Sequence, residues 1–149
     1  MESEDQDLES RLEAARVRQR SATAAREENR KNRELLEAVE AAERSAKDEE
    51  AIAAAEAEHG PTGRALRVIR TSFGCVILKR PSPIHYKRFR DVGKANTTAF
   101  EKLVRPCVIY PDASALDRIL EEEPATLDRC ANAVVELAGF RAEELSEKS

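Results

Sequence analysis

Three cysteines and two histidines are the side chains in this chain that most readily do chemistry. Cys75, Cys107 and Cys130 lie in separate apolar runs, and no two of them have Cys-x-x-Cys spacing. An odd number of cysteines without paired spacing is typical of buried free thiols in a reducing compartment. His59 and His85 have no neighbouring cluster of cysteines or carboxylates, whereas a zinc site needs three or four such ligands. The sequence therefore predicts no metal site.

One cysteine and one histidine, Cys107 and His85, could be imagined as a nucleophile and its base. Cys107, however, shares an apolar helical face with Leu103 and Val104, which favours a core position instead. The sequence contains no phosphate-binding loop, no nucleophile elbow and no glycine-rich dinucleotide turn. We therefore predict a protein that is not an enzyme, with no catalytic residues and no cofactor.

Basic side chains gather in the middle of the chain. Residues 59–110 hold 11 basic and 2 acidic side chains, whereas residues 1–58 hold 10 and 17, and residues 111–149 hold 4 and 10. This pattern indicates either an anionic partner or charge pairing within the molecule. The candidate partner-binding residues are Arg80, Tyr86, Arg88, Phe89, Arg90 and Arg105. For the two aromatic residues in this set, packing in the core is an equally good interpretation.

Nucleic acid is one partner that a basic segment could bind through its phosphates. The whole chain is nevertheless acidic, with a formal net charge of −4, and it has no tail of contiguous basic residues. It also lacks a recognised nucleic-acid-binding motif. The sequence therefore favours a protein partner over nucleic acid for this region.

The first 58 residues predict a long charged helical arm. They contain no glycine, proline or aromatic residue and are rich in alanine, glutamate and arginine, which favour helices. Leucines and valines form only two short seams, and residues 18–34 between them offer only alanine. A coiled coil needs a seam sustained over several heptads. A solvated helix and self-association or partner pairing through residues 7–58 therefore both stay open.

A small packed domain is expected over residues 59–140, followed by a polar tail at 141–149. All glycines, prolines and aromatic residues lie after residue 58, and two glycines and a proline within His59–Gly63 end the arm. The predicted fold class is α+β, with a β-hairpin followed by a bundle of three to four helices. The expected elements are strands at 64–71 and 75–80, a helix at 84–92, a helix capped by Thr98 that ends near Arg105, a helix capped by Asp112 or Ser114, and a last helix from Pro124 to a glycine cap at Gly139.

The order of these elements resembles a known group of small proteins. A His-Gly turn is followed by a basic hairpin, a short helix with two aromatic residues, a Cys-Val-x-Tyr-Pro segment and a final leucine-rich helix pair. Over residues 58–140 this resembles the tail assembly chaperones of tailed phages and phage-like elements. The marks that carry the resemblance are Arg80-Pro81, Tyr86, Phe89, Cys107-Val108, Tyr110-Pro111 and Pro124.

The resemblance implies a binding role without a reaction or cofactor. Such chaperones bind the tape measure protein, a long hydrophobic helical polypeptide, until tail tube subunits polymerise around it. The charged arm departs from the usual pattern of the group. Two alternatives stay open: a structural virion component of the capsid or tail that uses the arm as a contact, and a nucleic-acid-binding regulator that uses residues 64–105.

The expected location is the cytoplasm of a bacterial host or the virion. The N-terminal residues show neither the basic region nor the apolar region of a secretory signal, and no apolar run approaches membrane length. The sequence therefore predicts no membrane association. The resemblance implies a tape measure, tail or other virion protein as the partner.

Overall fold

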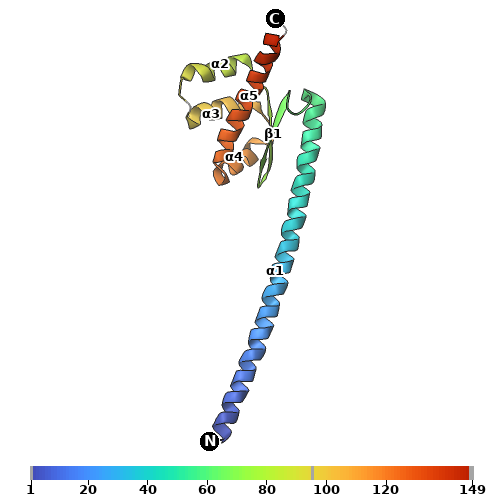
Figure 1. The fold of residues 1–149 in the computed structure, drawn as a ribbon, viewed down its shortest axis with the longest axis vertical. Helices are drawn as coiled ribbons and strands as arrows, with labels where there is room; N and C mark the ends of the chain where they lie inside the picture. Colours follow the sequence, from blue (N-terminus) through green and yellow to red (C-terminus); the bar gives the residue numbers. More distant parts are fainter. Residues whose placement is uncertain (1, 95, 148–149) are drawn as a thin grey trace. The chain divides into compact units, whose positions relative to one another are not determined.

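The protein is α+β, as the sequence predicts. The computed structural model describes residues 2–94 and 96–147 (Figure 1). The hairpin and the short helix that follows it were predicted nearly to the residue. In chain order the elements are α1 (Glu2–His59), β1 (Leu66–Thr71), β2 (Gly74–Lys79), α2 (Pro83–Val92), α3 (Thr97–Val104), the 3-10 turn η1 (Arg105–Cys107), β3 (Val108–Tyr110), α4 (Ala113–Glu122) and α5 (Ala125–Glu147).

The chain divides into two compact units, Met1–Glu43 and Arg44–Ser149. In the first unit, every side chain from residue 3 to residue 43 is exposed. An ion pair between Arg30 and Glu34, at 3.9 Å, supports this stretch of helix. Exposed pairs at this spacing contribute only a few tenths of a kcal/mol. The helix of the first unit therefore depends mainly on the helix propensity of its residues.

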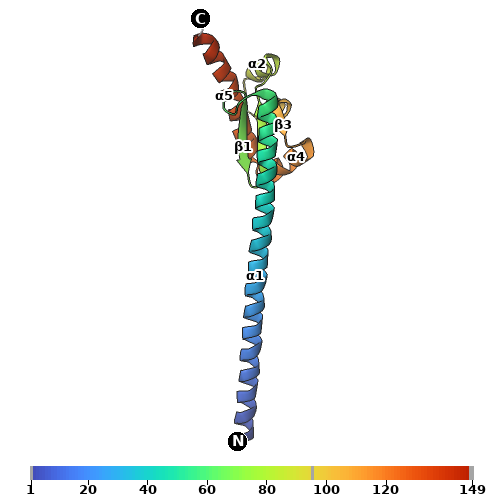
Figure 2. The ribbon, with the colours of Figure 1, turned by 90° about the vertical axis from the view of Figure 1, so that its right-hand side faces the viewer.

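The second unit is a three-stranded antiparallel sheet covered on both faces. β2 lies in the centre, with β1 and β3 as its neighbours. Its side chains alternate, so Val76 and Leu78 pack among residues of α3, α4 and α5, while Cys75 and Ile77 pack among residues of α1. Figure 1 shows the last turns of α1 and helix α5 on opposite sides of the hairpin, and Figure 2 shows the same stack turned by 90°.

The domain begins earlier than the sequence indicated. α1 does end at His59, as predicted, and Gly60 follows it with a φ of +112°. The compact unit nevertheless starts at Arg44 and not at residue 59. The reason is that Ile52 and Ala55 are buried against the sheet, so the last turns of the arm form one of its layers.

The start of α3 differs from the prediction. We expected Thr98 to cap this helix with Glu101 as its partner, but Thr98 lies inside α3. The cap is Asn96, whose side-chain oxygen accepts a hydrogen bond from the backbone N–H of Ala99 at 2.9 Å. The predicted helix end near Arg105 is confirmed, because Pro106 lies in the 3-10 turn. Pro106 cannot supply a backbone N–H to an α-helix.

Two further differences follow from tertiary packing. Val108 does not extend the apolar face of a helix; it begins β3, which pairs with β2 at Leu78. α5 does not end at a glycine cap, because Gly139 is helical and the helix continues to Glu147. A glycine inside a helix costs about 1 kcal/mol relative to alanine, which a packed helix can tolerate. The predicted polar tail at 141–149 is therefore largely helical backbone, and residues 148–149 lie outside the described residues.

Candidate functional site

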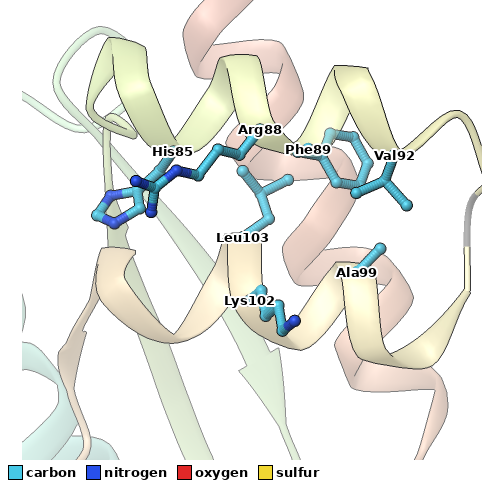
Figure 3. Close-up of a pocket in the computed structure, with 7 residues that line it drawn as sticks. All are labelled: His85, Arg88, Phe89, Val92, Ala99, Lys102 and Leu103. Atoms are coloured by element: carbon cyan, nitrogen blue, oxygen red, sulfur yellow. The ribbon is translucent and has the colours of Figure 1, made fainter.

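A groove lies between α2 and α3. It encloses a cavity of about 240 Å³. Figure 3 shows Phe89 and Val92 on α2 directed toward Ala99 and Leu103 on α3. The residues that line this α2–α3 groove are His85, Arg88, Phe89, Val92, Ala99, Lys102 and Leu103.

Both walls of the groove have well-defined ends. The Ser82 side chain caps α2 by accepting a hydrogen bond from the backbone N–H of His85 at 3.2 Å. Gly93 ends α2 with a left-handed φ of +69°, a conformation that glycine adopts at little cost. Asn96 then caps α3, so only a short connection joins the two helices. The two walls are therefore held as a helical hairpin.

The floor of the groove is apolar and continuous with the core. Leu103 is fully buried, and the rings of Phe89 and Phe100 lie 6.0 Å apart between centroids. Val92, at the edge of the groove, is 54% exposed. Because Val92 is accessible beside this packed floor, apolar side chains of a partner could contact it and be removed from water.

The rim of the groove carries positive charge on both sides. Arg88 extends from α2 and Lys102 from α3 (Figure 3). Within the part of the chain that the structure describes, neither forms an ion pair, and no carboxylate is among the residues that line the groove. His85 hydrogen-bonds through Nδ1 to the Ser82 hydroxyl at 2.8 Å. The groove therefore suits an apolar segment flanked by carboxylates.

The structure brings together two of the six candidate residues named from the sequence. Arg88 and Phe89 line the α2–α3 groove. Tyr86 and Arg90 line a separate hollow on α2 with Lys87 and Asp91. Tyr86 and Phe89 also pack against the core, which agrees with the alternative interpretation of both aromatic residues.

The remaining two candidates have partners within the domain. The Arg80 side chain donates a hydrogen bond from Nε to the backbone carbonyl of Arg64 at 2.9 Å. Arg105 contacts Asp117 at 2.6 Å and Glu101 at 4.0 Å. These side chains serve the fold where the structure places them, rather than the groove.

Sequence reasoning missed the second wall of the groove, above all Lys102. A basic residue on a different helix has no local sequence feature that places it at the same groove as Arg88. The sequence feature that could have predicted this wall is the succession of two short amphipathic helices on either side of Gly93, which indicates a helical hairpin.

Part of the basic middle is neutralised inside the domain. Arg67 contacts Glu136 of α5 at 3.1 Å, and Arg70 contacts Glu49 of α1 at 3.2 Å. Internal charge pairing, one of the two interpretations of the charge pattern, therefore holds for these two arginines of β1. Arg88 on α2 and Lys102 on α3, by contrast, have no ion-pair partner among the described residues.

The three cysteines are buried free thiols, as predicted. Burial raises the pKa of Cys75 to about 12 and the pKa values of Cys107 and Cys130 to about 11 each. The Cys107 thiol also donates to the backbone carbonyl of Leu103 at 3.4 Å. All three thiols are therefore protonated at neutral pH, and a protonated thiol is a poor nucleophile.

The described residues define a small α+β domain with a helical arm and a basic-rimmed groove. Residues 73–147, half of the chain, match the model of the family described as Domain of unknown function (DUF6848), and the chain belongs to this family. The matched region contains both walls of the groove and excludes α1 and β1. No curated protein and no solved structure shows a significant match. Among the described residues, no helix is both long enough and apolar enough to cross a bilayer.

Proposed function

We propose that this chain is a non-enzymatic binding protein that holds an amphipathic helix of a partner protein in the α2–α3 groove. The observation that carries the proposal is the groove itself, with an apolar floor at Phe89 and Leu103 and cations on both rims. Helix-in-groove recognition uses apolar anchors for affinity and rim charges for orientation. A cavity of about 240 Å³ suits a few anchoring side chains, being smaller than typical cofactor pockets.

The partner class that we propose is a tail protein of a phage or phage-like element, foremost the tape measure protein. Support comes from the order of elements that carries the resemblance to tail assembly chaperones. In the fold, the hairpin, α2, the η1–β3 segment that contains Cys107-Val108, and the final pair α4 and α5 follow one another in that order, with α3 inserted between α2 and η1. A long apolar helical client has many segments that could enter a groove of this kind, and shielding them would keep the client soluble.

The test is capture of tape measure segments co-expressed with the full chain. Val92→Asp should reduce capture at least tenfold, because it places a charge at the exposed edge of the apolar groove. Ile84→Asp is the matched control, since Ile84 lies on the same helix, is 64% exposed and does not line the groove. Equal capture by both variants and the unaltered chain would contradict the proposed site.

The exposed arm favours a second candidate function, a structural component of the particle. Every side chain of residues 3–43 is exposed, which leaves a long helical surface for contact with other subunits. Mass spectrometry of purified particles separates the two candidates. A chaperone is abundant in the lysate and absent from finished particles, whereas a structural component is present at a fixed copy number.

A further inference from the structure

We propose that the α2–α3 groove of one copy binds the N-terminal acidic segment, residues 2–15, of a second copy. The chain would then self-associate through a contact between segment and groove. The inference rests on the groove of the proposed function, but not on the identity of any client. It assigns an occupant to the groove when no client is present.

The charge of this segment complements the groove. Residues 2–15 hold six acidic side chains and one basic side chain. They form part of α1, so the segment is presented as a helix. Opposite charges on the two surfaces favour encounter and orient the segment in the groove. The rim cations Arg88 and Lys102, which have no ion-pair partner among the described residues, would gain one.

The apolar part of the segment also fits the groove. Leu8 and Leu12 are 58% and 52% exposed, and they are four residues apart, so they lie on one face of the helix. Neither has an apolar partner in its own unit that buries it. Docked against Val92, which is exposed, and Phe89, which is half-buried, each leucine would remove apolar surface from water at about 25 cal/mol per Å².

The positions of the carboxylates around the leucines match the two rims. At about 100° per residue, Glu4 lies about 60° to one side of the centre of the Leu8–Leu12 stripe, and Asp5 lies about 40° to the other side. The stripe is thus flanked by a carboxylate on each side. The groove is flanked by a cation on each side, Arg88 from α2 and Lys102 from α3 (Figure 3).

The arm contains a second apolar seam, at Leu35, Leu36 and Val39, that serves as a comparison. These side chains are also exposed, and residues 34–43 hold four glutamates. By the same helical geometry, however, only Glu43 lies within about 60° of the Leu35–Val39 stripe, while the others lie on the far side. Its carboxylates therefore flank one side only, which makes this seam the weaker match to a groove with two basic rims.

Contact of this kind joins two different surfaces, so it can either be exchanged reciprocally between two copies or continue from copy to copy as an open chain. In the open chain, one terminal copy would keep a free segment and the other a free groove, whereas a reciprocal pair would leave neither. A client helix that enters the groove would displace the segment, so client binding and self-association would compete.

The experiment is sedimentation velocity of the full chain over a concentration series, with circular dichroism as the check on folding. The unaltered chain should self-associate with rising concentration, more strongly at low salt. Leu8→Ser with Leu12→Ser should weaken association at least tenfold, and Arg88→Glu with Lys102→Glu should do the same. Leu35→Ser with Leu36→Ser is the matched control and should associate like the unaltered chain.

A charge exchange supplies the decisive arm. A chain with Glu4→Arg and Asp5→Arg should fail to associate alone, whereas a chain that also carries Arg88→Glu and Lys102→Glu should associate again. Three results would overturn the inference: a monomer at all concentrations, compaction that does not depend on concentration, or loss of association in the Leu35, Leu36 variant alone, which would indicate pairing between arms. The capture assay tests the proposed function independently. If Val92→Asp abolishes client capture, the proposed function is supported even when the chain does not self-associate.

Discussion

The Asp48 carboxylate in α1 accepts a hydrogen bond from the backbone N–H of Cys75 in β2 at 3.1 Å. Asp48 is only 8% exposed, and it is one of the few polar side chains buried in the described part of the chain. A Cβ added at Gly74, which has a φ of +119°, would lie 3.3 Å from the Asp48 carboxylate. This contact fastens the last turns of α1 to the hairpin and explains why the compact unit begins before the helix ends.

Replacing Asp48 with alanine should lower the free energy of unfolding by about 1 to 3 kcal/mol, because the buried N–H of Cys75 would lose its acceptor. Glu49→Ala is the control at the next position, where an exposed pair with Arg70 contributes about 1 kcal/mol at most. Urea unfolding of the three proteins measures the difference. If both variants lose the same small amount, the hydrogen bond does not hold α1 to the sheet.

The buried thiols predict a loss of stability in alkaline solution. An unfolded thiol has a pKa near its ordinary value of 9.0, whereas the folded pKa values are about 11 for Cys107 and Cys130 and about 12 for Cys75. The folded state therefore keeps protons that the unfolded state loses. The stability that this contributes is fully present below pH 9 and is lost as the pH rises toward the folded pKa values.

Each thiol should contribute a slope of about 1.4 kcal/mol per pH unit to this loss between pH 9 and pH 11. Urea unfolding between pH 7.5 and pH 10.5 measures the total loss of stability. Cys130→Ala isolates one thiol, because all other titrating groups are shared with the unaltered chain. Its slope should be shallower by about that amount, and an unchanged slope would show that Cys130 does not titrate differently in the two states.

Arg105 should matter little for binding or stability, although the sequence made it a candidate for partner contact. Its ion pairs with Asp117 and Glu101 are 40% or more exposed on every side chain, so removing them should cost less than about 1 kcal/mol. Arg105→Ala should also capture client segments as well as the unaltered chain does. A tenfold loss of capture would place part of the binding surface outside the α2–α3 groove.

Local patterns in the sequence were enough to predict the hairpin, α2 and the helix end at Pro106, because each depends on near neighbours. β3 was missed because three residues give no usable periodicity, and Val108 fits a helical face as well as a strand. The start of the domain was missed because Ile52 and Ala55 look like any apolar residues in an alanine-rich helix until the sheet buries them.

Only one of the two walls of the candidate site could be predicted from the sequence. Arg88 and Phe89 lie in a short helix whose basic and aromatic residues can be recognised from the sequence. Lys102 and Leu103 become part of the groove only when α3 folds back along α2, and that depends on the turn between Gly93 and Asn96. Arg80 and Arg105 carry the same charge as Arg88, but partners distant in the chain engage them.

The turn that forms the groove yields a last test, at the start of α3. The sequence offers two caps, Thr98 and Asn96, and the structure uses Asn96, whose side chain accepts from the Ala99 N–H at 2.9 Å. Asn96→Ala should lower the free energy of unfolding by about 1 kcal/mol, the usual cost of removing a cap. Thr98→Ala should change it by less than about 0.5 kcal/mol, because Thr98 is an exposed residue inside the helix.

Urea unfolding gives both values, and the capture assay adds a second readout. Because Asn96 sets where the second wall begins, its loss should also weaken client capture, whereas Thr98→Ala should leave capture intact. The reverse order of effects would mean that α3 begins at Thr98. The helix would then start later along the chain, and the position of Lys102 opposite Arg88 would have to be reconsidered.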